Sequence, residues 1–112
     1  MAEVQQIEIG TKKKVRILEK TRQRNIIKYL NAVPKCHAEA RTQTGYGIKG
    51  GADILGCING QHFELEVKQP KKQSTPTQKQ QLQVWEACGA IAGRVEDVET
   101  TRQLFKEYGI LI

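Results

Sequence analysis

The Asn59-Gly60 pair, which lies between two segments rich in apolar residues, constrains the fold of this chain more than any other feature. Asn-Gly flanked by alternating apolar residues is the strongest short-range signal for a β-hairpin with a two-residue type I′ turn. Such a turn fixes the register of the hairpin, because the residues on either side of it pair with each other. Counting outward from the turn along both strands brings Asp53 directly opposite Glu66.

The opposed carboxylates of Asp53 and Glu66 predict a metal site. Directly opposed residues have Cβ atoms about 5 Å apart, and like charges in that position are destabilising unless something neutralises them. A divalent cation would neutralise them, and hard oxygen ligands suit Mg²⁺ or Mn²⁺ rather than zinc, whose sites usually need His or Cys. Side chains two apart on a strand share a face, so Lys68 projects beside Glu66. The other face carries the residues expected in the core, namely Phe63, Leu65 and Val67.

A second interpretation of the same strand is a half-exposed surface. Any such strand alternates apolar and charged residues, and a Glu-x-Lys pair such as Glu66 and Lys68 is more often a solvated pair than an active site. The opposed Asp53 favours the functional interpretation. A β-bulge near Gly56 would shift the register and weaken it.

A candidate third acid, Glu19, lies in a predicted helix that runs from about Lys13 to Asn31. At about 100° per residue, Glu19 falls on the same line as the apolar Ile26 and Leu30. A carboxylate that points into a protein is costly unless it is paired or binds a metal. The alternative is an edge position, from which Glu19 reaches water or pairs with a neighbouring arginine.

The segment before the hairpin is predicted to contain a strand and a glycine-rich loop. Lys35 to Thr42 alternates as a strand does, and the loop follows over Thr44 to Gly51. The loop contains a formal match to the dinucleotide fingerprint, but a strand follows it instead of a helix, so we expect no nucleotide cofactor. Backbone amides of the loop, with Lys49 and Arg41, could cradle a phosphate; a flexible connector is the alternative.

The segment after the hairpin predicts helix, strand, helix. Thr75-Pro76-Thr77-Gln78 has the pattern of a capping box with proline at the first helical position, and Gly89 marks the end of that helix. Gln78 therefore has two interpretations, as a capping group or as a polar member of the active site. A strand over Ala90 to Val95 and a helix over Asp97 to Tyr108 complete an α/β fold, a mixed β-sheet flanked by helices.

Length and charge limit the class of protein further. The 112 residues suit one domain, and the three cysteines, odd in number and widely spaced, suit reduced thiols, so we expect a cytoplasmic protein. No apolar run is long enough to span a membrane. The net charge of +6 favours a polyanionic partner, chiefly nucleic acid. The candidate contacts to its backbone are Lys13, Lys14, Lys49, Lys71 and Lys72.

With Gly51-Ala52-Asp53-Ile54, then Glu66-Val67-Lys68, then Thr75-Pro76-Thr77-Gln78 at the start of a helix, the chain resembles a stand-alone VRR-NUC domain. That family belongs to the PD-(D/E)xK nuclease superfamily, whose restriction-endonuclease-like core is an αβββαβ unit. The resemblance runs from about Glu19 to Glu96 within a single domain spanning residues 1–112. One departure is visible, because Ala52 replaces the proline that usually precedes the aspartate.

The resemblance implies roles for particular residues. The ligands of Mg²⁺ or Mn²⁺ would be Glu19, Asp53, Glu66 and the backbone carbonyl of Val67. Lys68 would be the catalytic lysine, and Gln78 the helix residue near it. Small members of this family are similar to Holliday-junction resolvases, form dimers and occur in phages and bacteria, so the resemblance also implies a homodimer.

We therefore expect a metal-dependent DNA endonuclease that hydrolyses phosphodiester bonds, with a preference for branched or otherwise structured DNA. Little in 112 residues suggests an element that reads bases, so recognition by shape is preferred. The alternatives are a nucleic-acid-binding module that has the fold but does not cut, and an RNase or restriction-type nuclease with the same site.

Overall fold

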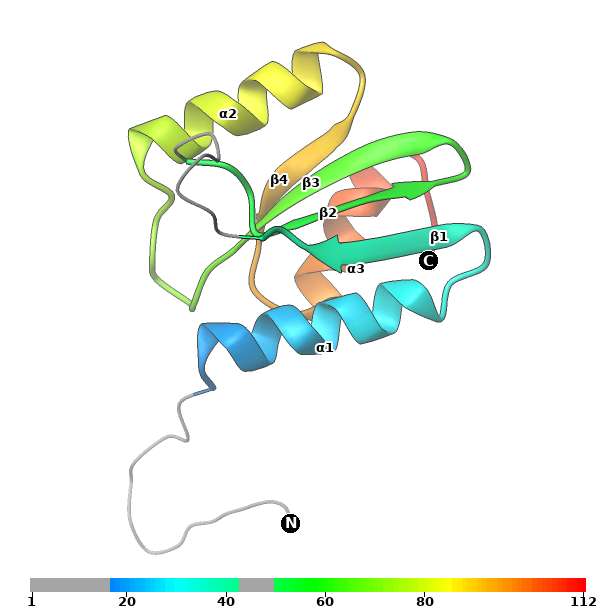
Figure 1. The fold of residues 1–112 in the computed structure, drawn as a ribbon, viewed down its shortest axis with the longest axis horizontal. Coiled ribbons are helices and arrows are strands. Elements are labelled where there is room, and N and C mark those ends of the chain that lie inside the picture. The colour runs from blue at the N-terminus through cyan, green and yellow to red at the C-terminus, as the bar shows by residue number, and fades with distance from the viewer. Residues whose placement is uncertain (1–16, 43–49) are drawn as a thin grey trace, which may run out of the picture.

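The computed structural model describes residues 17–42 and 50–112 as three helices and one four-stranded sheet (Figure 1). In chain order the elements are α1 (Glu19–Asn31), β1 (Cys36–Ala40), β2 (Ile54–Ile58), β3 (Gln61–Val67), α2 (Pro76–Ala87), β4 (Ile91–Val95) and α3 (Val98–Glu107). The strands lie side by side in the order β1-β2-β3-β4, and only the β3–β4 pair is parallel. The predicted mixed sheet flanked by helices is confirmed.

The hairpin has the predicted register. Ile58 pairs with Gln61 and Ile54 pairs with Leu65, with no interruption of the ladder between them. The bulge considered at Gly56 does not occur. Asn59 and Gly60 both have positive φ, 50° and 82°, as a type I′ turn requires.

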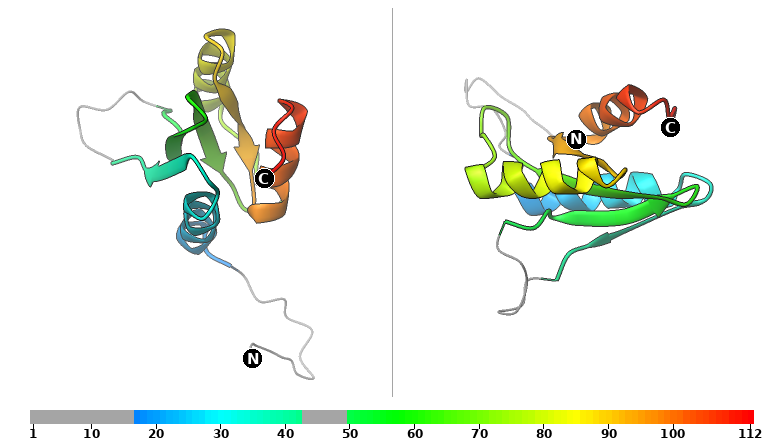
Figure 2. Two further views of the ribbon diagram at one scale, coloured as in Figure 1. Left: turned by 90° about the vertical axis from the view of Figure 1, so that its right-hand side faces the viewer. Right: turned by 90° about the horizontal axis from the view of Figure 1, so that it is seen from above.

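The apolar core lies between the sheet and the pair of helices α1 and α3. Ile26 and Leu30 of α1 are fully buried, and Phe105 of α3 meets Phe63 of β3 edge to face, with ring centroids 5.4 Å apart. Helix α2 covers the opposite face of the sheet, as the two perpendicular views show (Figure 2). The two faces of β3 therefore have different partners: an apolar core on one side and α2 on the other.

The ends of α2 and α3 follow from capping chemistry. Thr75 caps α2 in a complete capping box with Gln78, and Asp97 caps α3 in the same way with Thr100. Gly89 lies just after α2 with a φ of 97°, as expected for a residue that ends a helix. These predicted boundaries are confirmed.

The predicted start of α1 is wrong. The helix begins at Glu19 and not near Lys13, because Leu18 has an extended backbone and makes no side-chain cap. Lys13 and Lys14 lie outside the described residues, as do Lys49 and most of the glycine-rich loop. Within the described ranges, no helix is long and apolar enough to cross a membrane.

Candidate active site

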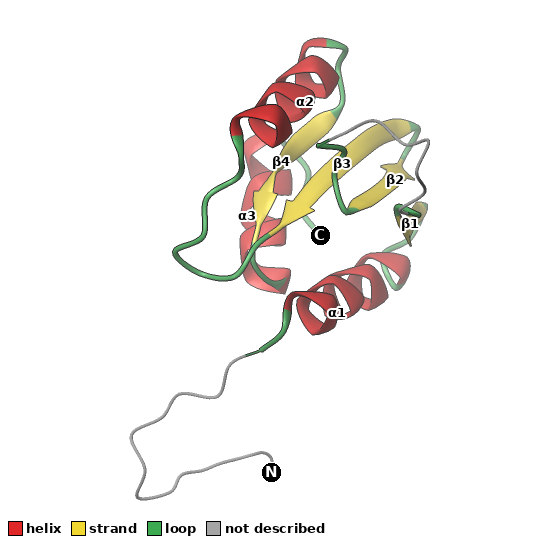
Figure 3. Ribbon diagram, turned by 60° about the vertical axis from the view of Figure 1, so that its left-hand side comes forward, coloured by secondary structure: helices red, strands yellow, loops and turns green. Residues whose placement is uncertain are grey.

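Asp53 and Glu66 meet at one end of the sheet, where β2 begins and β3 approaches its end. Asp53 immediately precedes Ile54 of β2, and its Oδ2 accepts a hydrogen bond of 2.8 Å from the backbone N–H of Val67. The first turn of α2 lies on the same side, where it brings Gln78 against Glu66. Figure 3 shows this end of the sheet, between α1 and the first turn of α2. The hairpin arithmetic therefore predicts this meeting of carboxylates correctly.

Glu66 is buried, although a solvated surface pair was the alternative interpretation. The residue is 2 % exposed, and Glu64 on the same face is fully buried. That alternative is wrong because α2 and Arg41 cover this face of β3. Burial and the adjacent negative charge of Asp53 raise the pKa of Glu66 to about 8, and the ammonium of Lys68 partly offsets both effects.

The two carboxylate oxygens of Glu66 have different environments. Oε2 accepts a hydrogen bond of 2.9 Å from Nε2 of Gln78 and lies 3.6 Å from Nζ of Lys68. Oε1 is buried and has no hydrogen-bond partner in the described part of the chain. A buried carboxylate oxygen without a partner is costly, so this atom has the chemistry of a metal ligand. The donor set therefore fits a hard divalent cation.

Gln78 caps α2, as one interpretation predicts, and also contacts Glu66, while its role in an active site stays a prediction. Its Oε1 accepts the backbone N–H of Thr75 at 2.8 Å and so closes the capping box, while its Nε2 donates to Glu66. Each half of the amide has one partner. The first turn of α2 is thereby fixed to the carboxylate of β3.

Glu19 lies near these acids without joining a compact cluster. As the first residue of α1 it lines a cavity of about 310 Å³, together with Lys20, Gln23, Ala40, Arg41, Asp53 and Val67. Among the residues placed by the structure, no three His, Cys, Asp or Glu side chains are close enough to hold one ion. Glu19 therefore shares a cavity with Asp53, but its role as a third ligand stays a prediction.

Val67 lies at the cavity, whereas the predicted basic residues of the following loop, Lys71 and Lys72, are exposed. Val67 lines the cavity, and its N–H points toward Asp53. The N–H and C=O of a residue in an extended strand point toward the same neighbour, so its carbonyl faces this side as well. Lys71 and Lys72 are exposed in the loop between β3 and α2, and Lys71 has a positive φ of 71°.

A second set of polar side chains surrounds the buried Glu64, and neither Glu64 nor His62 was among the predicted site residues. Glu64 accepts a hydrogen bond from the guanidinium of Arg41 with one carboxylate oxygen and contacts Nε2 of His62 with the other, at 2.6 Å. The alternation along β3 places Glu64 beside Glu66 but does not show that it is buried. Only the tertiary contact with Arg41, across two strands, could have indicated it.

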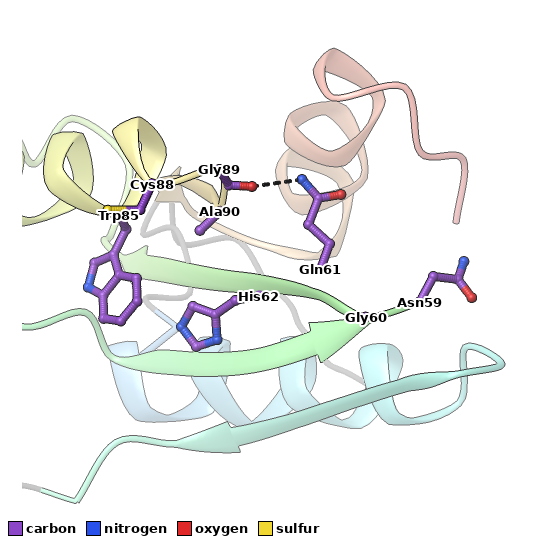
Figure 4. A pocket seen from close by; sticks show the side chains of 8 residues that line it. All are labelled: Asn59, Gly60, Gln61, His62, Trp85, Cys88, Gly89 and Ala90. Atoms are coloured by element: carbon purple, nitrogen blue, oxygen red, sulfur yellow. Dashed lines mark hydrogen bonds between the residues drawn. The ribbon is translucent and has the colours of Figure 1, made fainter.

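His62, which contacts Glu64, also lines another pocket, at the opposite end of β3 from Glu66. Its ring packs on Trp85 of α2, with centroids 4.6 Å apart (Figure 4). The pocket has a volume of about 440 Å³, and Gln61 closes part of its wall by donating to the carbonyl of Gly89. The described carboxylates do not line it, so it is separate from the candidate metal site.

Comparisons with protein-family models and with curated proteins find no match to this sequence. A solved structure named "VRR_NUC domain protein" is similar to this chain, with a TM-score of 0.66 over 84 % of this chain and 89 % of the other. The chain has a VRR-NUC fold. The two sequences are 14 % identical, so the likeness concerns the fold and not the activity. The fold class expected from the quoted motifs is confirmed.

Proposed function

We propose that this protein is a metal-dependent endonuclease that hydrolyses phosphodiester bonds in DNA. The observation that carries the proposal is the buried Glu66, which lies beside a second carboxylate, Asp53, and keeps one oxygen, Oε1, without a hydrogen-bond partner among the described residues. A structural carboxylate at this depth would have both oxygens paired, as those of Glu64 are. The VRR-NUC fold adds support, because its likeness is to a protein whose name denotes a nuclease domain.

The residues that would hold Mg²⁺ or Mn²⁺ are Asp53, Glu66, Glu19 and the backbone carbonyl of Val67. When bound, the ion would supply an activated water and positive charge beside a phosphate oxygen. The protein contributes the arrangement of the ligands. Gln78 and Lys68 both approach Oε2 of Glu66 and so leave Oε1 for the cation.

Lys68 is the proposed catalytic lysine. Its Nζ lies 3.6 Å from Glu66, and its side chain is only 15 % exposed, so the ammonium is held close to the carboxylates. In that position it can orient the attacking water and stabilise the negative charge that develops on the phosphate. Gln78 acts through Glu66, whose orientation it fixes.

The proposed substrate is branched or otherwise structured DNA, bound by a homodimer. A two-fold protein matches a two-fold junction, and a single domain of this size offers little surface for a four-way junction. The exposed Lys71 and Lys72, with Lys13, Lys14 and Lys49, would contact the phosphate backbone, where contacts give position without reading sequence.

Two other functions share the fold. A module that binds nucleic acid without cutting it would gain nothing from paired carboxylates that repel phosphate, so the buried acids favour an enzyme. An RNase or a restriction-type nuclease would use the same site, and the substrate decides between these enzymes.

Cleavage assays test the proposal. Wild type and Lys68→Ala are incubated with supercoiled plasmid, a four-way DNA junction and RNA, in Mg²⁺, Mn²⁺ or EDTA. We expect metal-dependent cleavage that prefers the junction and falls by about 10²–10³-fold in the variant. Binding of these substrates without cleavage in either metal would favour the binding module, and cleavage of RNA alone would favour the RNase.

A further inference from the structure

The cavity next to Asp53 has basic walls as well as acidic ones. Lys20, Gln23 and Arg41 line it together with the candidate metal ligands Glu19, Asp53 and Val67. The side chain of Arg41 is 31 % exposed, so it is neither a surface side chain nor a fully buried one. Positively charged and amide side chains can bind the anionic part of a ligand. A metal ion held by the neighbouring carboxylates would bind the same ligand from the other side of its phosphate.

Arg41 is tied to the same short segment that presents Asp53. Its backbone N–H donates to the carbonyl of Asp53 at 2.8 Å, and its Nε donates to the carbonyl of Ala52 at 2.8 Å. Gln23 donates to the carbonyl of Asp53 as well, at 2.9 Å. The guanidinium is therefore held close to Asp53 by a hydrogen bond to a backbone carbonyl, that of the preceding residue Ala52.

The third tie of Arg41 is the buried carboxylate of Glu64, which accepts from its Nη2. Burial of an ion pair adds little to stability, because the desolvation cost can exceed the Coulombic gain. An apolar residue at position 64 would be at least as good for the core. The pair is therefore better explained as a device that orients Arg41.

The support continues behind Glu64. Its second oxygen contacts Nε2 of His62 at 2.6 Å, and the His62 ring packs against Trp85 (Figure 4). Helix α2, which fixes Glu66 through Gln78 at its first turn, thus also supports Glu64 through Trp85 near its last turn. Both acids of β3 are held by the same helix, but only Glu66 keeps an oxygen without a partner.

We propose that Arg41 is a phosphate-binding residue of this cavity and that Glu64 and His62 are positioning residues that hold its guanidinium. The ligand group is a phosphodiester of the nucleic acid, which the guanidinium can contact through the N–H groups that are not bonded to Ala52 and Glu64. The inference rests on the proposed function, since it places this phosphate beside the carboxylates of Asp53 and Glu66, which are proposed to bind the metal ion. It adds a phosphate site that the metal-ligand set does not contain.

The test measures binding of a fluorescein-labelled four-way DNA junction in EDTA, so that cleavage and metal binding do not contribute. The variants are Arg41→Ala and Glu64→Gln. The matched control is Glu39→Gln, which makes the same charge change at an exposed residue of β1 whose partner is His37. Thermal melts establish that each variant is folded.

Arg41→Ala should bind about tenfold more weakly, and the slope of log K against log salt should decrease by about one, as for the loss of one phosphate contact. Glu64→Gln should also bind several-fold more weakly, although it makes the protein more positive. Glu39→Gln should bind as wild type does, or slightly more tightly. Charge alone predicts tighter binding for both Glu→Gln variants, so the sign of the Glu64→Gln effect separates positioning from electrostatics.

The proposal is overturned if Glu64→Gln binds as tightly as Glu39→Gln, if Arg41→Ala keeps the affinity and salt slope of wild type, or if wild type shows no binding. Should Arg41→Ala not fold, Arg41→Lys replaces it, because lysine keeps the charge beside Glu64 but lacks the planar fork. We then expect several-fold weaker binding with an unchanged slope, and wild-type affinity would overturn the proposal. If the variants show these binding effects but wild type does not cleave DNA with either metal, the proposed phosphate site stands and the proposed nuclease activity is wrong.

Discussion

At the scale of single residues, the proposed function depends on Glu66. This carboxylate is buried beside another one, which raises its pKa to about 8, and its two oxygens are used unequally. Sequence alone predicts the proximity to Asp53, because the turn fixes the register. It does not predict the burial, which depends on α2 folding back over β3.

The raised pKa gives a prediction for the stability of the metal-free protein. Native Glu66 holds a proton up to about pH 8, whereas an ordinary carboxyl loses it near 4.5, so stability decreases as the pH rises between these values. Glu66→Gln imitates the protonated form and cannot ionise. We expect its melting temperature in EDTA to exceed that of wild type by at least about 5 °C at pH 8, with a smaller difference at pH 5.

Calorimetric melts across this pH range provide the check. Glu96→Gln is the control, since Glu96 is a partly exposed acid paired with Arg94 and lies outside the carboxylate pair. A Glu66→Gln protein that is less stable than wild type at pH 8 would show that the ionised carboxylate is well accommodated without metal.

At the scale of elements, α2 links the fold to the site through its first turn. Thr75 and Gln78 close the capping box, and Gln78 alone continues to Glu66. The cap of α2 and the contact with Glu66 can therefore be separated by mutation, although the two residues are only three positions apart.

Thr75→Ala removes one half of the capping box and leaves the bond from Gln78 to Glu66. We expect a loss of about 1 kcal/mol in the free energy of unfolding, with full cleavage activity below the melting temperature. Gln78→Ala removes the cap and also the donor to Glu66, so we expect a comparable loss of stability and a cleavage rate that falls by at least about tenfold. Equal rates for the two variants, measured by melts and junction cleavage, would refute the role of Gln78.

The central strand β2 has a position that accepts only glycine. A Cβ at Gly56 would overlap the backbone carbonyl of His37 and the ring of Phe63, neither of which can move without disturbing the sheet or the core. Gly56→Ala should therefore lower the free energy of unfolding by about 3 kcal/mol, at the upper end for overpacked positions. Urea denaturation measures this, and a loss below about 1 kcal/mol would mean that the strand adjusts.

Local signals explain which elements the sequence predicts. The hairpin, the two capped helices and the glycines after them each follow from residues within a few positions of one another. The sequence predicts too early a start for α1, because Leu18 provides no capping signal and the basic segment before it has no helix breaker close to the true boundary. The sequence does not predict the ion pair of Arg41 and Glu64, because it joins the residue after β1 to β3, and no local pattern specifies such a contact.

At the scale of the whole molecule, the parts converge on one end of the sheet. The start of β2, the end of β3 and the first turns of α1 and α2 border the same region. Fold alone does not establish a function, so the activity has to be tested on the residues themselves.

The central claim is that the pair of Asp53 and Glu66 binds a divalent cation. Isothermal titration of Mn²⁺ into wild type and Glu66→Gln at pH 7 tests this claim without requiring the correct nucleic acid. We predict that wild type binds Mn²⁺ with release of a proton, because the ligand must be deprotonated, and that Glu66→Gln binds at least about tenfold more weakly. Equal affinities, or no binding of Mn²⁺ by wild type, would show that Asp53 and Glu66 do not form a metal site.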